Sequence, residues 1–171
     1  MTTSSLMIEK LLDTDVDHLR SIAREIWYGH YPAILSTEQI EYMLDMMYGP
    51  GVIEREMHHE GIFYDKVLKG GELVGFISYG PEGKENSTRM KLHKCYLSPS
   101  LHGFGYGQMM LAHACNKARE MSFSEVILNV NKNNKKAIGA YQKFGFRIIG
   151  SETNEIGRGF VMDDYVMEYR L

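Results

Sequence analysis

The residues with the clearest capacity for chemistry form a glycine-rich turn between Tyr96 and Leu111. Glycines stand at alternate positions, Gly103, Gly105 and Gly107, after a proline and before an apolar segment. Glycine adopts positive φ and lets a ligand approach the backbone amides. Such amides, together with the N-terminus of a helix, bind phosphate or pyrophosphate. An ordinary strand-to-helix turn would use the same glycines for geometry alone, so both interpretations stay open at this point.

Neither of the two familiar nucleotide-binding loops matches this turn. A dinucleotide fingerprint needs a glycine three residues after its second glycine, and the residue three after Gly105 is Gln108. A P-loop needs Gly-Lys followed by Ser or Thr, whereas Gly107 is followed by Gln108. The sequence therefore argues against both loops.

A second segment, Asn134–Phe146, bears on the same choice. It follows the pattern N-x-x-A-x-x-x-Y-x-K-x-G-F, matched by Asn134, Ala137, Tyr141, Lys143, Gly145 and Phe146. In the turn, His102, Gly105 and Gly107 stand in the places of a [QR]-x-x-G-x-[GA] motif. Together the two segments resemble the GCN5-related N-acetyltransferase (GNAT) superfamily. The resemblance is specific from about Met90 to Gly150.

Two further stretches resemble bacterial members near the polyamine acetyltransferases: Tyr31–Leu44 and the tail Gly159–Met167. The resemblance implies an acetyl-CoA-dependent N-acetyltransferase that acts on a primary amine, above all that of a small molecule such as a polyamine. The implied mechanism is direct attack of the amine within a ternary complex. Two alternatives stay open. One is acetylation of a protein N-terminus or lysine, and the other is a non-catalytic sensor of acyl-CoA.

The resemblance implies two groups of residues for acetyl-CoA, which would be a co-substrate. The backbone N–H groups of Tyr96 and Leu97 would hold the pantetheine and the acetyl oxygen. The turn would bind the pyrophosphate through His102, Gly103, Phe104, Gly105, Tyr106 and Gly107. His102 replaces the usual Gln or Arg, so it either donates to phosphate or simply tolerates the turn. Asn134 would cap a helix and contact CoA, and Lys143 would either touch a phosphate or remain in solvent.

The resemblance also implies two catalytic side chains. Tyr141 occupies the position of the tyrosine that protonates the departing CoA sulfur, and a phenol with a pKa of about 10 holds its proton at neutral pH. Packing on an apolar helix face is the alternative. Many relatives carry a glutamate base on the preceding strand, and aligning Leu92–Leu97 puts His93 there. An imidazole titrates near neutral pH and suits proton transfer. A local hydrogen bond on a sheet face would explain His93 equally well.

The acceptor amine is expected to bind beside the first two helices. Tyr28, Tyr31 and Glu41 are the candidates, because aromatic and acidic groups suit a cationic amine. Glu41 shares a helix face with Glu38 and Asp45, and such a face is more commonly just solvated. No metal is expected, because the histidines show no convincing ligand spacing with Cys, Asp or Glu.

The elements that must position these residues follow from hydrophobic periodicity. Helices are expected from Asp13 to about Gly29, from Ser36 to Gly49, over 52–59, over 105–121 and over 134–144. Strands are expected over 6–11, 61–68, 72–79, 90–97, 125–130, 146–150 and 160–170. Apart from the short helix over 52–59, this order reads β-α-α-β-β-β-α-β-α-β-β. It predicts an α/β (α+β) fold with a central mixed, mostly antiparallel sheet flanked by helices. No repeat or linker is evident, so one N-acetyltransferase domain over residues 1–171 is expected.

Composition excludes several classes of protein. The 19 basic and 22 acidic residues leave a net charge of −3, which provides no general attraction to nucleic acid or anionic lipid. No apolar run approaches the roughly 18 residues of a membrane span, and Cys95 and Cys115 are too few for a disulfide framework. We therefore expect a cytoplasmic protein whose partner is a small-molecule amine, with no nucleic-acid or membrane partner. A homodimer is left open.

Overall fold

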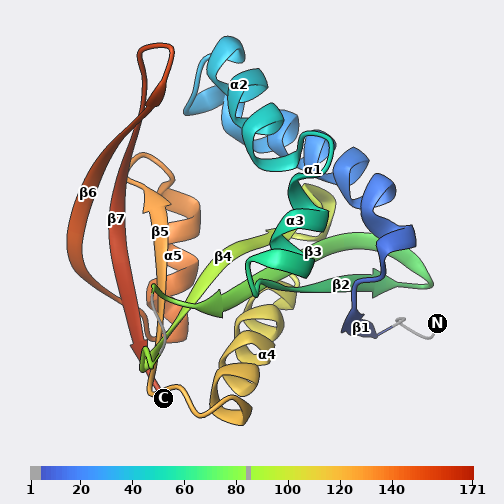
Figure 1. Cartoon of the computed structure of the whole chain (residues 1–171), viewed down its shortest axis with the longest axis vertical. Coiled ribbons are helices and arrows are strands. Elements are labelled where there is room, and N and C mark those ends of the chain that lie inside the picture. Colours follow the sequence, from blue (N-terminus) through green and yellow to red (C-terminus); the bar gives the residue numbers. More distant parts are fainter. Residues whose placement is uncertain (1–4, 84–85) are drawn as a thin grey trace. The chain divides into compact units, whose positions relative to one another are not determined.

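The computed structural model describes residues 5–83 and 86–171. Within these residues, seven strands form a mixed sheet in the order β1-β2-β3-β4-β5-β7-β6 (Figure 1). The strands are β1 Leu6–Lys10, β2 Phe63–Lys69, β3 Glu72–Pro81, β4 Arg89–Leu97, β5 Glu125–Asn131, β6 Arg147–Gly157 and β7 Phe160–Arg170. The α-helices are α1 Val16–His30, α2 Thr37–Tyr48, α3 Val52–His59, α4 Tyr106–Glu120 and α5 Lys135–Phe144. Of the described helices, none combines the length and the apolar character needed to span a membrane.

The expected fold class and element order are confirmed, including the short helix α3. Most element boundaries lie within two residues of those expected, and two differ by more. The first predicted helix begins with a 3-10 turn over Asp13–Asp15, and α1 proper starts at Val16. Strand β6 was expected to end at Gly150 but continues to Gly157, because it pairs with β7 as far as Gly157↔Phe160. Nearly all of β6 is exposed, so its outer half carries no apolar alternation that would reveal a strand.

The described chain forms two compact units. The first comprises Met1–Tyr79 with Lys94–Met110, and the second comprises Gly80–His93 with Leu111–Leu171. Strands β3 and β4 and helix α4 each contribute residues to both units. The expectation of one domain over the whole chain stays a prediction.

The first unit contains an antiparallel β1–β2–β3 ladder and helices α1, α2 and α3. Helix α1 buries an apolar stripe that comprises Val16, Leu19, Ile22, Ala23, Ile26 and Trp27. Helix α2 begins as predicted after Ser36, whose hydroxyl accepts a hydrogen bond from the Gln39 amide at 3.2 Å. The buried stripe of α2 ends at Tyr48, whereas the apolar sequence pattern of Ile40, Met43 and Leu44 would continue at Met47. This difference brings a tyrosine hydroxyl into the core.

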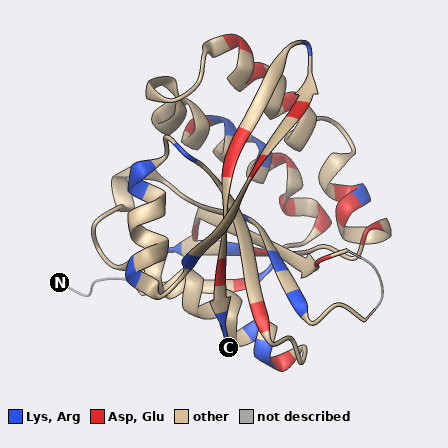
Figure 2. Cartoon of the chain, turned by 90° about the vertical axis from the view of Figure 1, so that its left-hand side faces the viewer, with Lys and Arg blue, Asp and Glu red and all other residues tan. Residues whose placement is uncertain are grey.

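In the second unit, β4 and β5 are parallel and are paired over a short stretch. The register runs from Arg89↔Glu125 to Lys91↔Ile127, and in the described part of this unit the pairing stops there although both strands continue. Strand β5 then pairs with β7, and β7 with β6, both antiparallel. Figure 1 shows β6 and β7 as a long twisted hairpin. Acidic and basic positions are interspersed along the chain, with several acidic ones on this hairpin (Figure 2).

Candidate active site

The predicted glycine turn follows β4 and is tied to the end of that strand. The Ser98 amide donates to the carbonyl oxygen of Val74 at 2.8 Å, which holds the end of β4 beside β3. The Nε2–H of His102 donates to the carbonyl oxygen of Leu97 at 3.0 Å. One ring nitrogen of His102 therefore anchors the turn to its own strand, a role that the motif did not reveal.

Two of the three glycines in the turn need to be glycine for conformational reasons. Gly103 and Gly105 have φ values of +86° and +80°, in the left-handed region where side chains are strained. A Cβ built on Gly103, Gly105 or Gly107 would meet nothing within 4 Å, so the space beside these backbones is open. At Gly107, which lies in α4 without positive φ, neither the chain's conformation nor its neighbours require glycine. A ligand that approaches the backbone closely would require it.

A fourth glycine shapes the strand that carries the predicted acetyl-binding amides. A Cβ on Gly75 of β3 would lie 2.5 Å from the carbonyl oxygen of Tyr96 and 3.3 Å from the Cα of Leu97. Because backbone cannot yield at such a distance, only glycine lets β3 and β4 approach here. Gly75 thus sets the path of β4 at Tyr96 and Leu97.

Helix α4 begins directly after the turn and suits an anion at its first residues. Its first turn carries no acidic side chain, and the first amides of a helix have no partner within the helix. These amides and the helix dipole give the site a positive potential. Such a donor set suits a pyrophosphate, and the assignment of that group to residues 102–107 stays a prediction.

The second unit holds the other predicted cofactor residues and both predicted catalytic side chains. Asn134 is buried and caps α5, with its Oδ1 accepting from the Ala137 amide at 3.3 Å. Tyr141 lies on α5, half-buried, with its ring edge-on to Phe146 at 5.9 Å between centroids. Lys143 is exposed in the last turn of the same helix. The cap is thus confirmed, and the role of Tyr141 as the acid stays a prediction.

His93 lies on β4 with its side chain exposed, between the buried Leu92 and Lys94. In the same unit, the pairing of β4 with β5 has already ended at Lys91. A side chain at this position is open to solvent, so it can exchange a proton with water. Its role as a base stays a prediction.

On the acceptor side, the fold brings Tyr28 and Glu41 together, but Glu41 already has a cation. Arg24 donates to the two carboxylate oxygens of Glu41 at 2.7 and 3.3 Å, and the Tyr28 hydroxyl also donates to Glu41. The Arg24 hydrogen bonds, followed by that of Tyr28, lower the pKa of Glu41. The guanidinium also lies 5.0 Å from the centroid of the Tyr28 ring. An incoming ammonium would therefore have to share Glu41 with Arg24.

The third acceptor candidate, Tyr31, lies beside β4. Its hydroxyl is 3.5 Å from that of Tyr96, and its ring is 4.4 Å from that of Trp27 between centroids. The Trp27 ring is also 6.0 Å from the Tyr96 ring. A predicted acceptor residue thus contacts a predicted acetyl-site residue.

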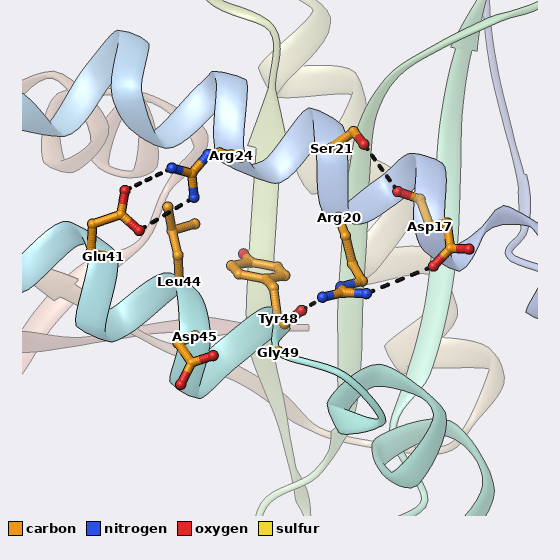
Figure 3. A pocket seen from close by; sticks show the side chains of 9 residues that line it. All are labelled: Asp17, Arg20, Ser21, Arg24, Glu41, Leu44, Asp45, Tyr48 and Gly49. Carbon is orange, nitrogen blue, oxygen red and sulfur yellow. Dashed lines mark hydrogen bonds and ion pairs between the residues drawn. The ribbon is translucent and has the colours of Figure 1, made fainter.

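A pocket of about 440 Å³ lies between α1 and α2 (Figure 3). Its lining residues are Asp17, Arg20, Ser21, Arg24, Glu41, Leu44, Asp45, Tyr48 and Gly49. Much of the charge around it is internally paired, since Arg24 binds Glu41 at 2.7 Å and Arg20 lies 3.7 Å from Asp17. The Nε of Arg20 also donates to the carbonyl oxygen of Tyr48 at 2.7 Å. Of the predicted acceptor residues, Glu41 lines this pocket.

Comparison with known proteins agrees with this arrangement. The acetyltransferase (GNAT) family model matches residues 16–146, which include the turn, β4 and the α5 motif. The chain belongs to the GNAT family of acetyltransferases. It is therefore an acyltransferase that carries out acetyl-CoA-dependent N-acetylation.

Individual relatives span the GNAT chain to different extents. The spermidine N(1)-acetyltransferase of Thermoplasma acidophilum is 27% identical over 163 residues, covering 93% of this chain and 96% of that enzyme. The crystal structure of the PaiA N-acetyltransferase from the same organism, in complex with coenzyme A, superposes with a TM-score of 0.80 at 25% identity, covering 98% and 99% of the two chains. The N-alpha-acetyltransferase 50 of Danio rerio is 30% identical over 120 residues, or 64% of this chain and 71% of that protein.

The GNAT co-substrate fits the site on the evidence of the chain's own geometry. The turn offers open space beside three glycines, two of them with positive φ, and a helix start without acidic side chains. Among residues 5–83 and 86–171, no group of three or more His, Cys, Asp or Glu side chains is arranged to hold a metal ion.

Sequence reasoning missed a buried charged cluster that includes a lysine of β4. Lys94 is 4% exposed, and its ammonium donates to Oε2 of Glu56 at 2.9 Å and to the Tyr64 hydroxyl. Tyr64 donates to the same Glu56 oxygen. Burial lowers the pKa of Lys94, and attraction to Glu56 opposes that shift. The sequence did contain one sign of this cluster: Lys94 falls on the same alternating positions of β4 as the buried Met90 and Leu92.

Proposed function

We propose that this acetyltransferase acts on a primary amine of a small molecule, with polyamines as the leading acceptor class. The observation that carries the proposal is the end-to-end similarity to the spermidine N(1)-acetyltransferase of Thermoplasma acidophilum, which spans 93% of this chain. The similarity to N-alpha-acetyltransferase 50, which would favour a protein N-terminus, spans 64% of the chain. The more complete match favours the small amine.

In the proposed mechanism, transfer occurs directly between two bound substrates. Acetyl-CoA supplies the activated acetyl group, held by the amides of Tyr96 and Leu97 and by the turn over 102–107. The amine nitrogen bonds to the thioester carbon while the carbon–sulfur bond breaks. His93 takes the proton that the amine loses, directly or through one water. Tyr141 gives its phenolic proton to the departing thiolate, and solvent restores both groups.

Asn134 and Lys143 complete the proposed co-substrate site. The confirmed cap by Asn134 supports a fixed start of α5, from which a side chain or amide can contact CoA. Lys143 is exposed and offers a cation to a phosphate. Each of these roles rests on the match to the family motif.

For the acceptor, we assign Tyr28, Tyr31 and Glu41 to amine binding. The rings of Tyr28 and Tyr31 offer cation–π contacts, and Tyr31 adjoins Tyr96 on the acetyl-binding strand. Glu41 would contribute an acidic group that it shares with Arg24. The proposal therefore relies more on the aromatic rings than on the carboxylate.

Release of free thiol from acetyl-CoA, measured with a panel of acceptors, tests this function. The panel contains spermidine, spermine, simple alkylamines, peptides with a free N-terminus and peptides with an internal lysine. We expect thiol release with the polyamines above the rate without acceptor. Release with peptides alone would assign the protein-acetylating alternative. Binding of acetyl-CoA without release for any acceptor would favour the sensor.

A further inference from the structure

The ammonium of Lys69 lies close to the Tyr106 ring, which in turn lies close to the Phe104 ring of the glycine turn. Lys69 is the last residue of β2, and its Nζ lies 5.4 Å from the centroid of the Tyr106 ring at the start of α4. The Tyr106 ring is in turn 6.1 Å from the Phe104 ring, with an angle of 32° between the planes. All three residues belong to the first compact unit. The end of the β2–β3 hairpin is thus brought to the turn.

Phe104 presents its ring to solvent. It is 69% exposed, more than any other large hydrophobic residue that the structure describes. Its neighbours Gly103 and Gly105 leave open space on both sides. An aromatic ring so placed offers a face for stacking by a planar ligand such as a nucleobase.

The charge of Lys69 is the next feature beside the turn. Among the residues that the structure describes, none places a carboxylate oxygen within 4.0 Å of its ammonium, whose closest recorded interaction is with the Tyr106 ring. Lys66, on the same strand, is different: Glu9 and Asp15 lie 3.4 and 2.9 Å from its ammonium. Lys69 can therefore receive an anion without first breaking an ion pair.

We propose that Lys69, Tyr106 and Phe104 bind the adenosine end of the co-substrate. Phe104 stacks on the adenine, and the Lys69 ammonium, held over Tyr106, binds the phosphate on the ribose 3′ oxygen. The inference rests on the proposed function, since it takes acetyl-CoA as the ligand of the turn. The reason is covalent connectivity: a pyrophosphate on the turn is joined through ribose to both the adenine and the 3′-phosphate, so both must lie near the turn. Lysine binds phosphate as a point charge and needs no fixed fork geometry.

The consequence is that the chain distinguishes CoA from dephospho-CoA, which lacks the 3′-phosphate. Isothermal titration calorimetry with CoA, dephospho-CoA and 4′-phosphopantetheine, which lacks the adenosine, measures this without turnover. Wild-type protein should bind CoA about tenfold more tightly than dephospho-CoA, the value of one charge-assisted contact. Lys69→Gln should remove that difference by weakening CoA alone. Phe104→Ala should weaken CoA and dephospho-CoA by the same factor and leave 4′-phosphopantetheine unchanged.

Lys117→Gln is the matched control, because this lysine lies in the last turn of α4 and pairs with Glu120 at 3.3 Å. It should bind all three ligands as the wild type does. Melting temperatures of the ligand-free variants report whether each is folded. Equal affinity of wild-type protein for CoA and dephospho-CoA would overturn the role of Lys69, as would equal weakening of both by Lys69→Gln. If wild-type protein bound none of the three ligands, the proposed function itself would fail.

Discussion

Lys94→Met removes the ammonium from the centre of a buried cluster. The side chain is 4% exposed, and the ammonium lies 5.3 Å from the centroid of the Tyr48 ring and 5.1 Å from that of Tyr64, in addition to its bonds to Glu56 and the Tyr64 hydroxyl. Methionine matches the length and the apolar stem of lysine. The variant therefore changes the charge and the hydrogen bonds while it keeps most of the packing.

The expected loss of stability follows from what remains around Glu56. Removing one partner of a buried ion pair costs about 3–5 kcal/mol, because the other charge is left unpaired. Glu56 keeps the hydrogen bond from Tyr64 and has a side chain that is 15% exposed, so the lower end applies, about 3 kcal/mol. For a chain of this length, that corresponds to a fall of roughly 6–12 °C in the melting temperature.

A second substitution separates lost charge balance from lost packing. In Lys94→Met with Glu56→Gln, no unpaired charge remains and the amide oxygen still accepts from Tyr64. We expect the double variant to be more stable than Lys94→Met alone by about 2 kcal/mol. Urea unfolding followed by the fluorescence of Trp27, the sole tryptophan, gives the free energies. Far-UV circular dichroism must report the same transition for the two-state treatment to hold.

Two results would refute this reasoning. One is a loss below about 1 kcal/mol in Lys94→Met, the size of a surface ion pair. The other is additivity, in which the double variant is as unstable as the sum of the two single variants. Lys117→Met, which removes an exposed i,i+3 pair, serves as the control and should change little.

Four further predictions concern the site and one surface pair. Tyr141→Phe should lower kcat by about 10²–10⁴-fold and leave acetyl-CoA affinity unchanged in a binding titration, whereas full turnover would return Tyr141 to packing against Phe146. His93→Ala should abolish the acidic limb of the kcat/KM profile, and His93→Glu should restore activity with the limb at lower pH; a profile unaltered by His93→Ala would reject the base. Gly105→Val should remove the rise in melting temperature on adding acetyl-CoA, because a β-branched residue cannot hold φ at +80°, and a full rise would show that the turn does not bind it. The hydrogen bond from Lys66 lowers the pKa of Asp15 below its ordinary 3.8. The resulting stabilisation is present above pH 3.8 and is lost as the pH falls through the lower folded-state value, so Asp15→Asn should lose less stability on acidification than wild type, and parallel curves would contradict this.

The fold was predictable where one face of an element is apolar and the other polar. Helix α1 was expected from Asp13 to about Gly29, and its buried stripe from Val16 to Trp27 shows why, because burial selects every third or fourth position. The full length of strand β6 was not predicted, because its outer half has no apolar face. Its pairing with β7 runs to Gly157, but its exposed outer half, Ser-Glu-Thr-Asn-Glu, is held by backbone hydrogen bonds and leaves no hydrophobic pattern.

Within the site, predictability depends on how far apart in the chain the interacting groups lie. The positive φ values of Gly103 and Gly105 and the cap by Asn134 involve groups within a few residues, so motif spacing predicted them. The Arg24–Glu41 pair joins residues 17 apart, and the Lys94–Glu56 pair joins residues 38 apart. No sequence-spacing rule predicts such pairs, because they form only when helices and strands pack together.

The same contrast between local and distant contacts separates the co-substrate part of the proposed site from the acceptor part. In the proposed mechanism the co-substrate half relies on backbone amides in one continuous turn. The glycines mark that turn in the sequence, and the family resemblance supplies the identity of its ligand. The acceptor half relies on side chains from α1, α2 and β4. There Glu41 has the acidic group expected for a cationic amine, but Arg24 already neutralises it. Because the preference for an amine depends on the balance of such pairs, the acceptor has to be found by assay, and Arg24 belongs beside Glu41 in any set of variants used to find it.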